Sequence, residues 1–294
     1  MEKSLYTSNL RNYKKIYQGK VRDVYEVDDE NLLIVTTDRI SVFDTILPTP
    51  IPNKGKILNQ ISLNWFKRYR NIIENHLAKI KIDELNLSQD ERELIKERST
   101  VVKKCKAIPA ESIVRGYIIG SGYKEYKKTG SICDIELPKN LVISSKFKSP
   151  IFTPSTKADV GDHDENISYK KFSNLVGDKI AKQIKNISLE IFNDASKYLI
   201  RKNIILADTK FEFGITSEDK LVLIDEILTP DSSRFWPLET YSEGENPISL
   251  DKQYIRDYII NTSWKDGDPM PALPNEVVSQ TMKKYKDLEN IIFS

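Results

Sequence analysis

The sequence is poor in the residues that build disulfide or zinc frameworks. Its 294 residues include two cysteines, Cys105 and Cys133, and two histidines, His76 and His163. Two cysteines provide no framework of disulfide bridges, which favours a protein of a reducing, cytoplasmic environment. Two cysteines and two histidines scattered along the chain do not favour a zinc site either.

Long apolar runs and an excess of one charge are also missing. No run approaches the roughly 18 residues of a membrane-spanning helix. The first residues, MEKSLYTSNL, lack the apolar core of a signal peptide. The 45 Lys and Arg residues nearly balance the 43 Asp and Glu residues, for a net charge of +2. With no basic tract, we expect neither a nucleic acid nor a membrane as a partner.

Two common nucleotide-binding signatures are absent, because the chain contains neither GxxxxGK[ST] nor GxGxxG. The composition is that of an ordinary globular protein, with 39% hydrophobic residues. The length suits one large domain or two smaller ones. We expect a smaller antiparallel-sheet domain over residues 1–110 and a larger α+β domain over residues 111–294, since the strand in TVVKKCKAIPAE ends at Pro109.

Periodic apolar positions predict the regular elements. Ser88 and Glu91 have the spacing of a capping box at a helix start, and Ser168 is expected to cap one long helix that reaches Tyr198. Two helices near the end of the chain are expected to pack on the larger domain. The remaining expected elements are strands at 17–27 and 31–37, a helix at 56–69, and the two late helices at 251–261 and 275–290.

The segment from Ile205 to Trp236 has the alternation of a strand with one charged face. Asp208, Lys210 and Glu212 fall on that face. If the following turn is centred on residues 218 and 219, Glu212 lies opposite Asp225 on the next strand. Two carboxylates so placed destabilise each other unless a cation lies near. Either Mg²⁺ binds there, or the face is a solvated one on an edge hairpin.

Two other segments have the residue types of anion sites. Gly19, Lys20 and Arg22 in YQGKVRDVYEV suit the triphosphate of a nucleotide, although a surface strand with two basic residues is the simpler interpretation of the segment. In PAESIVRGYIIGSG, the Gly-Ser-Gly turn around Ser121 offers backbone N–H groups, and Arg115 offers a guanidinium. The loop TPDSSRFWP adds Arg234, whose planar fork suits a phosphate or carboxylate.

The motifs together resemble one family. They are YQGKVRDVYEV, TDRISVFD, PAESIVRGYIIGSG, FTPSTKAD…GDHDENIS, LADTKFEFG and LIDEILTPDSSRFW, in collinear order over most of the chain. This pattern is similar to that of the SAICAR synthetase (phosphoribosylaminoimidazole-succinocarboxamide synthase) family of purine biosynthesis. One departure is Ile119, where the family usually has Thr or Ala. The length resembles the longer forms of the family, which tend to be monomers.

The resemblance implies an ATP-dependent ligase. It would join L-aspartate to the carboxylate of carboxyaminoimidazole ribonucleotide (CAIR) through an acyl phosphate, giving SAICAR, ADP and phosphate. It also implies a two-lobed α+β fold of antiparallel sheets flanked by helices, distantly like protein kinases and ATP-grasp enzymes, with ATP between the lobes.

The resemblance also implies roles for individual residues. Lys210 would neutralise the reacting carboxylate, and Asp208 would orient the incoming amine. Glu212 and Asp225 would hold Mg²⁺. The nucleotide would meet Gly19, Lys20, Arg22, Lys106, Ile108 and Glu111. The ribonucleotide and aspartate would meet Asp38, Arg39, Arg115, Ser121, Ser155, Lys157 and Arg234. Asp159 and His163 would belong, with Ser155 and Lys157, to a loop that orders on binding.

Two other classes of function remain open on the residues alone. A small-molecule or lipid kinase on a related scaffold would share the metal pair but would release phosphate without aspartate. A non-enzymatic binding module, using the basic residues for nucleic acid, is opposed by the near-neutral charge.

Overall fold

The computed structural model describes residues 4–157, 164–265 and 267–294. They form an α+β fold of helices and antiparallel sheets, as the sequence predicts. The chain divides into two compact units. The first unit comprises Met1–Lys67, Asn75–Cys105 and Asp251–Ser294, and the second comprises Arg68–Glu74 and Lys106–Leu250. The prediction of functional domains at 1–110 and 111–294 stays a prediction.

The first unit is built on a four-stranded antiparallel sheet in the order β1-β2-β3-β6. Its strands are β1 (Lys15–Gln18), β2 (Arg22–Glu26), β3 (Asn31–Thr36) and β6 (Ser99–Lys103). Residues 17–27 are therefore not the single strand that the sequence predicted. Gly19 N–H donates to the Arg22 carbonyl at 2.8 Å, which closes a turn and makes β1 and β2 a hairpin.

The predicted capping box is confirmed at α2 (Gln89–Ile95). The Ser88 hydroxyl accepts from the N–H of Glu91, and the Glu91 carboxylate accepts from the N–H of Ser88. The two reciprocal bonds satisfy backbone donors that the first helical turn leaves without partners. The η1 turn (Ile82–Glu84) precedes α2, and α2 packs with β3 and β6 through a cluster that contains Leu33 and Ile95.

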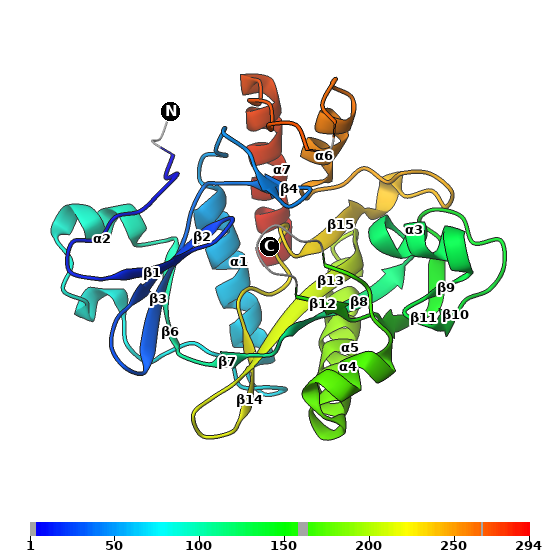
Figure 1. Cartoon of the computed structure of the whole chain (residues 1–294). Helices are drawn as coiled ribbons and strands as arrows, with labels where there is room; N and C mark the ends of the chain where they lie inside the picture. The colour runs from blue at the N-terminus through cyan, green and yellow to red at the C-terminus, as the bar shows by residue number, and fades with distance from the viewer. Residues whose placement is uncertain (1–3, 158–163, 266) are drawn as a thin grey trace. The chain divides into compact units, whose positions relative to one another are not determined.

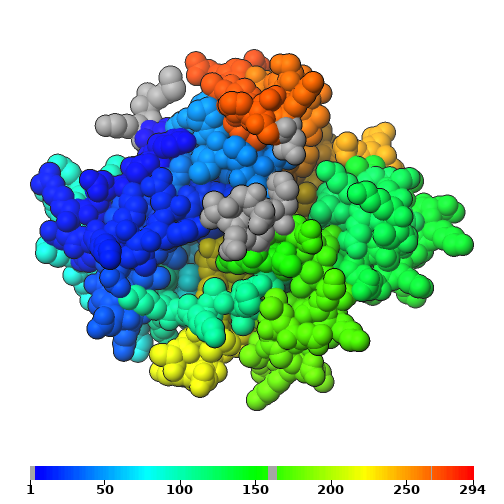
Figure 2. All heavy atoms as spheres, in the orientation of Figure 1, coloured from blue at the N-terminus to red at the C-terminus, as the bar shows by residue number. Residues whose placement is uncertain are grey.

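The second core of the first unit joins chain segments far apart in the sequence. Residues of β4 (Ser41–Val42), α6 (Gln253–Ile260) and α7 (Asn275–Phe293) contribute to it. The first unit also contains β5 (Thr45–Ile46) and most of α1 (Lys54–Tyr69). Buried Ile40 and Leu47 pack with Ile255, Ile259 and Val277, and Figure 2 shows the orange C-terminal residues beside the blue residues of this region. The late helices form as predicted, but they belong to the first unit, where they pack with N-terminal residues, and not to the larger unit.

The second unit is organised around β13 (Ile204–Ile215), the long central strand of a seven-stranded sheet. The first half of β13 pairs with β8 (Ala110–Tyr117) and β15 (Ser233–Pro237), and its second half pairs with β7 (Lys106–Ala107) and β14 (Leu221–Ile224). Strands β11 (Lys146–Phe152) and β12 (Ser155–Thr156) pair with β8. The expected single strand over TVVKKCKAIPAE is thus divided among β6, β7 and β8.

Helices cover this sheet. Figure 1 shows α5 behind the sheet, and its contacts are with β13, β8 and β11. The predicted long helix is two helices, α4 (Tyr169–Val176), capped by Ser168, and α5 (Asp178–Ile200). They are divided at Gly177, whose φ of 87° and ψ of 142° lie outside the helical region. The other elements are α3 (Gly120–Thr129), β9 (Ser131–Ile132), β10 (Ile135–Glu136) and η2 (Leu238–Thr240).

The register of the β13–β14 hairpin differs from the prediction by one residue. Glu212 pairs with Ile224, not with Asp225. The loop closes with Thr216 N–H donating to the Lys220 carbonyl, and Asp219 takes a left-handed φ of 57°. This three-residue connection replaces the two-residue turn at 218 and 219 that the sequence suggested. Within the described residues, no helix is long and apolar enough to cross a membrane.

Candidate active site

The predicted charged face of β13 exists as a row of ion pairs. Lys210 donates to Glu212 at 2.8 Å and to Glu111 of β8 at 2.7 Å. Glu212 also accepts from Lys157 at 2.6 Å. Asp208 and Glu212 are buried, and the side chain of Lys210 is 29% exposed. Alternation along a pleated strand places these three charges side by side, because residues two apart share a face.

Strand pairing brings further predicted residues to the row. Ser155 of β12 pairs with Glu111, and its hydroxyl lies 3.3 Å from the Glu111 carboxylate. Glu111, which the sequence assigned to the nucleotide, therefore lies between Lys210 and Ser155. Lys106 and Ala107 pair with the end of β13, and Ile108 N–H donates to the Phe213 carbonyl. The main chain of Lys106–Ile108 is thus held beside the strand that carries the row.

A second cluster lies at the start of the row, around Asp208. Arg115 and Arg234 both donate to its Oδ2 atom, at 3.1 Å and 2.6 Å. Arg115 also donates to the Ser121 hydroxyl at 3.0 Å and to the Thr153 hydroxyl at 3.0 Å. Thr153 lies in the polar segment FTPSTKAD but was given no role from the sequence, because its partner lies 38 residues away. Two guanidinium groups on one carboxylate leave a net positive cluster at this point.

The Gly-Ser-Gly turn lies against the two arginines at the N-terminus of α3. A Cβ atom on Gly120 would lie 2.6 Å from an Arg234 nitrogen, and Gly120 has a φ of +60°. A Cβ atom on Gly122 would lie 3.2 Å from Nε of Arg115. At Gly120 a side chain would both strain the left-handed backbone and displace the Arg234 guanidinium, and at Gly122 it would press on Arg115. A helix N-terminus beside two arginines is suited to bind an anion.

Burial and the ion pairs shift the pKa values of the row in opposite directions. Burial alone would lower the pKa of Lys210, but Glu212, Glu111 and Asp225 raise it well above its usual value. Burial raises the pKa of Glu111, an effect that Lys210 opposes. Burial would also raise the pKa of Glu212, but Lys210 and Lys157 hold it well below its usual range. Lys210 therefore stays charged, and Glu212 stays ionised at neutral pH.

Asp225 follows β14 with a left-handed φ of 67° and is partly buried. It contributes to the raised pKa of Lys210, so its charge acts on the same row as Glu212. Within residues 4–157, 164–265 and 267–294, no three His, Cys, Asp or Glu side chains are grouped to hold a metal by themselves. Mg²⁺ needs fewer protein side chains than three, since it binds one or two carboxylates together with phosphates.

The first unit holds the other predicted residues. Gly19 and Lys20 form the β1–β2 turn, and Arg22 begins β2. The ammonium of Lys20 lies 2.6 Å from Asp44, and both side chains are about half exposed. Asp44 was not assigned a role from the sequence, because the 24-residue separation and the Phe43–Asp44 turn give no local signal.

Asp38 and Arg39 lie fully inside the first unit. Asp38 accepts from the N–H groups of Leu5 and Gly55 and pairs with Arg98 at 2.9 Å. Their expected role in substrate binding stays a prediction. Asp159 and His163, expected in a loop that orders on binding, lie outside the described residues.

Comparisons with known proteins identify the family. The sequence pattern of the SAICAR synthetase family matches residues 15–271. The chain is 49% identical to the phosphoribosylaminoimidazole-succinocarboxamide synthase of Actinobacillus succinogenes, over 95% of this chain and 97% of that protein. It is 49% identical to the same-named protein of Thermodesulfovibrio yellowstonii over the whole of both chains.

Solved structures agree with the sequence comparisons. The SAICAR synthase of Saccharomyces cerevisiae, complexed with SAICAR, has a TM-score of 0.90 and 40% identity over 98% of both chains. A SAICAR synthetase in complex with ADP has a TM-score of 0.67 and 27% identity, over 94% of this chain and 96% of that one. The fold is therefore that of these enzymes, and the chain belongs to the SAICAR synthetase family.

Proposed function

We propose that the charged row of β13 carries out the reaction of this family. That reaction is the ATP-dependent joining of L-aspartate to the carboxylate of CAIR, and it gives SAICAR, ADP and phosphate in purine biosynthesis. The observation that supports the assignment to this row is the side-by-side placement of Asp208, Lys210 and Glu212, bounded by two arginines at one end.

The reaction has two steps in this proposal. A carboxylate oxygen of CAIR attacks the terminal phosphorus of ATP, and the bond to ADP breaks, which leaves an acyl phosphate. The amine of aspartate then attacks the acyl carbon, phosphate leaves, and the amine loses a proton as the amide forms. Both steps gather negative charge on oxygens, so fixed positive charge near them lowers the barrier.

Lys210 supplies that positive charge. Its raised pKa keeps the ammonium protonated, and its two carboxylate partners hold it on the charged face of β13. An ammonium is a point charge on a flexible stem, so it can follow an oxygen whose charge changes. We assign Glu111 the role of orienting Lys210, beside its expected contact with the nucleotide.

Asp208 orients the amine of aspartate. Its Oδ2 atom accepts from both arginines, and its Oδ1 atom binds the incoming amine. Arg115, Arg234 and Ser121, with the N-terminus of α3, bind the 5′-phosphate and carboxylate groups of the ribonucleotide. Ser155 and Lys157 contribute to substrate binding beside Glu111 and Glu212.

The carboxylates of the row fit Mg²⁺. The Glu212 side chain already binds two ammonium groups and stays ionised, and carboxylate oxygens are the ligands that Mg²⁺ prefers. Glu212 and Asp225 would hold the ion, which supplies charge neutralisation for the phosphates when it is bound. Gly19, Lys20 and Arg22 bind the triphosphate, and the main chain near Lys106 and Ile108 meets adenine.

A coupled assay of ADP release tests the function. Sustained ADP and phosphate release should require both CAIR and L-aspartate, and SAICAR should form in equal amount. Sustained phosphate release without aspartate would contradict the proposal and revive the kinase alternative, which the family match over residues 15–271 does not favour. A cytoplasmic location and a monomeric state stay predictions, which fractionation and sedimentation would check.

A further inference from the structure

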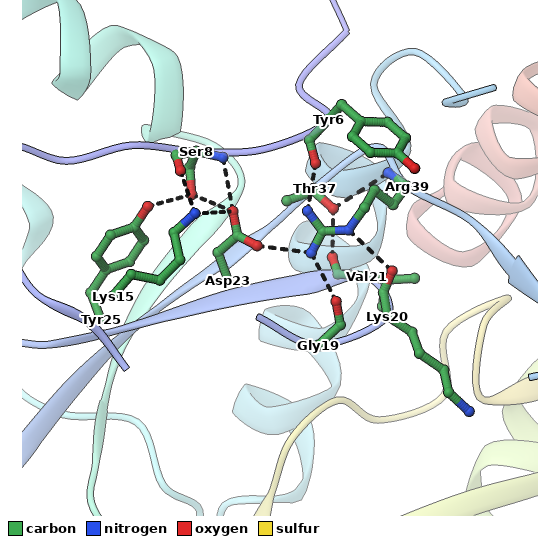
Figure 3. A network of polar contacts seen from close by, with 10 residues as sticks. All are labelled: Tyr6, Ser8, Lys15, Gly19, Lys20, Val21, Asp23, Tyr25, Thr37 and Arg39. Carbon is green, nitrogen blue, oxygen red and sulfur yellow. Dashed lines mark hydrogen bonds and ion pairs between the residues drawn. The ribbon is translucent and has the colours of Figure 1, made fainter. Parts of the chain in front are cut away.

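Arg39 is fully buried, and its guanidinium binds the β1–β2 turn from inside (Figure 3). Its Nη2 atom donates to the Gly19 carbonyl at 3.0 Å, and its Nε atom donates to the Lys20 carbonyl at 3.1 Å. The same guanidinium donates to the Tyr6 carbonyl and forms an ion pair with Asp23 at 2.8 Å. Most of its bonds therefore go to backbone oxygens of the turn and the N-terminal segment.

A third carbonyl of the turn is held in the same way. The hydroxyl and N–H of Thr37 both donate to the Val21 carbonyl, at 2.8 Å and 2.9 Å. In a planar trans peptide the C=O and the following N–H point in opposite directions. The N–H groups of Lys20 and Val21 therefore point away from Arg39. Among the described residues, no acceptor is found for these two N–H groups.

Outward-pointing consecutive N–H groups form a concave site for an anion. The side chain of Lys20 also extends away from Arg39 in Figure 3. Two backbone donors and an ammonium are thus presented on the side of the turn that faces away from the buried guanidinium. The arrangement exists only while the carbonyls are held inward, which is what Arg39 and Thr37 do.

The carboxylate behind Arg39 is itself held by hydrogen bonds. Asp23 is fully buried and accepts from the N–H and hydroxyl of Ser8 at 2.8 Å and 2.7 Å. Lys15 lies 3.5 Å from the same carboxylate and donates to the Ser8 carbonyl. The groups that bind the Arg39 guanidinium are therefore the buried carboxylate of Asp23 and three backbone carbonyls of the first unit's own chain.

We propose that Arg39 is a positioning residue for the triphosphate of ATP. It acts through the Gly19–Arg22 turn and does not itself contact a substrate, in contrast to the substrate contact expected from the sequence. The proposal rests on the proposed function, which assigns that turn to the triphosphate. A residue that shapes this turn and contacts neither CAIR nor aspartate should change the binding of ATP and leave the binding of CAIR and aspartate unchanged.

Arg39→Lys tests this role. Lysine keeps the charge beside Asp23 but lacks the planar fork that reaches two carbonyls at once. We expect the KM for ATP, and the dissociation constant of ADP measured by titration calorimetry, to rise about 10-fold to 100-fold, the effect of one lost charged hydrogen bond. The KM values for CAIR and aspartate should change less than about twofold, within the scatter expected of an uninvolved site.

Arg98→Lys is the matched control. Arg98 is also buried and pairs with Asp38 at 2.9 Å in the same unit, but its side chain does not contact the turn. Arg98→Lys should lower the melting temperature about as much as Arg39→Lys does, without a selective rise in the KM for ATP. If the two variants weaken all substrates equally, Arg39 is an ordinary structural residue and the proposal is wrong.

Lys20→Met separates this inference from the proposed function. If Lys20→Met weakens ATP but Arg39→Lys does not, the turn binds ATP and the inference about Arg39 fails alone. If Lys20→Met leaves ATP binding unchanged, the assignment of the turn to the triphosphate fails, and the inference fails with it. Should Arg39→Lys not fold, Arg39→Gln combined with Asp23→Asn replaces the buried ion pair by neutral amides and should show the same selective loss for ATP.

Discussion

The Arg39 network of the first unit and the Lys210 row of the second unit are both made of paired charges, but they differ in what the cation binds. Arg39 is fully buried and donates mainly to backbone carbonyls. Lys210 is partly exposed and donates to two carboxylates. A carbonyl in a folded chain cannot be exchanged for a ligand, whereas a carboxylate can take a metal ion or a proton instead.

In the proposed function, this difference separates charges that hold the backbone from charges that take part in chemistry. In the ion pair of Arg39 with Asp23, the two side chains are 1% and 0% exposed. Removing one partner therefore leaves the charge of the other buried away from water. The ion pair of Lys157 with Glu212 has 42% and 11% exposed side chains, so water or ligand can replace a partner. The comparison predicts losses of stability in the first network and losses of turnover or binding in the second.

The largest expected effect is on stability. Asp23→Ala removes the charged partner of Arg39 and the acceptor of Ser8, and should lower the free energy of unfolding by about 3–5 kcal/mol, as when one member of a buried ion pair is deleted. Urea unfolding followed by circular dichroism measures this. Asp44→Ala, which deletes half of an exposed pair with Lys20, is the control and should cost less than about 1 kcal/mol. Equal losses in the two variants would remove the distinction between the networks.

The next effect is on turnover. Lys210→Met deletes the charge with little change of shape, and kcat should fall about 10²-fold to 10³-fold, as when one electrostatic donor to a transition state is lost. ATP binding and the melting temperature should change little, because Glu212 keeps Lys157 as a partner and because Glu111, whose pKa is already raised by burial, can take up a proton when Lys210 is lost. Steady-state kinetics and thermal unfolding check both parts. Near-normal kcat in a less stable protein would make Lys210 a structural residue.

A smaller effect is expected on ribonucleotide binding. Arg234→Ala removes a partly exposed guanidinium beside the Gly-Ser-Gly turn. The KM for CAIR should rise about 10-fold to 100-fold, as for a lost charged hydrogen bond, and the KM for ATP should rise less. Arg115→Ala should act in the same direction, with an added cost in stability because Arg115 is buried. Exposed Arg201→Ala is the control. Equal losses for CAIR and ATP in Arg234→Ala would indicate a folding defect.

The smallest effects concern pH. The lowered pKa of Glu212 means that the folded protein binds fewer protons at this site than the unfolded chain. Its contribution to stability is therefore present above the unfolded pKa, about 4.3, and is lost as the pH falls through the folded pKa. Glu212→Gln should make the acid side of the stability curve shallower.

Glu111 provides the opposite sign. Its raised pKa means that its ionisation costs stability as the pH rises through the unfolded pKa, about 4.3, toward the folded pKa. Glu111→Gln should remove the loss of stability that accompanies this ionisation. Urea midpoints between about pH 3 and pH 7, the range that spans these ionisations, measure both. If both variants changed the pH dependence of stability in the same direction, Glu212 and Glu111 would not have pKa values shifted in opposite directions.

Local patterns were enough to predict many elements. Ser88 and Glu91 form their capping box because the interaction is complete within one helical turn. The charged face of β13 follows from the period of two that every strand has. The helix break at Gly177 was missed because glycine is permitted within a helix, and only the observed backbone conformation shows that this one ends it.

Other features depend on contacts between distant segments. The register of Glu212 was wrong by one residue because Asp219 takes a left-handed conformation in a three-residue loop, which a strand pattern does not encode. The C-terminal helices have apolar faces that suit several partners, and their packing against Ile40 and Leu47 is decided by the fold.

The sequence by itself determined the family, the reaction and the alternation that sets Asp208, Lys210 and Glu212 on one face, since motif content and strand period are properties of the chain. Only the tertiary structure decided that Asp208 binds two arginines from β8 and β15, and that Arg39 faces the Gly19–Lys20 turn from inside. The reason is physical. The partners of these groups are contributed by strands and turns far apart in the sequence, and a charge has no defined role until folding decides which acceptors surround it and how much water remains.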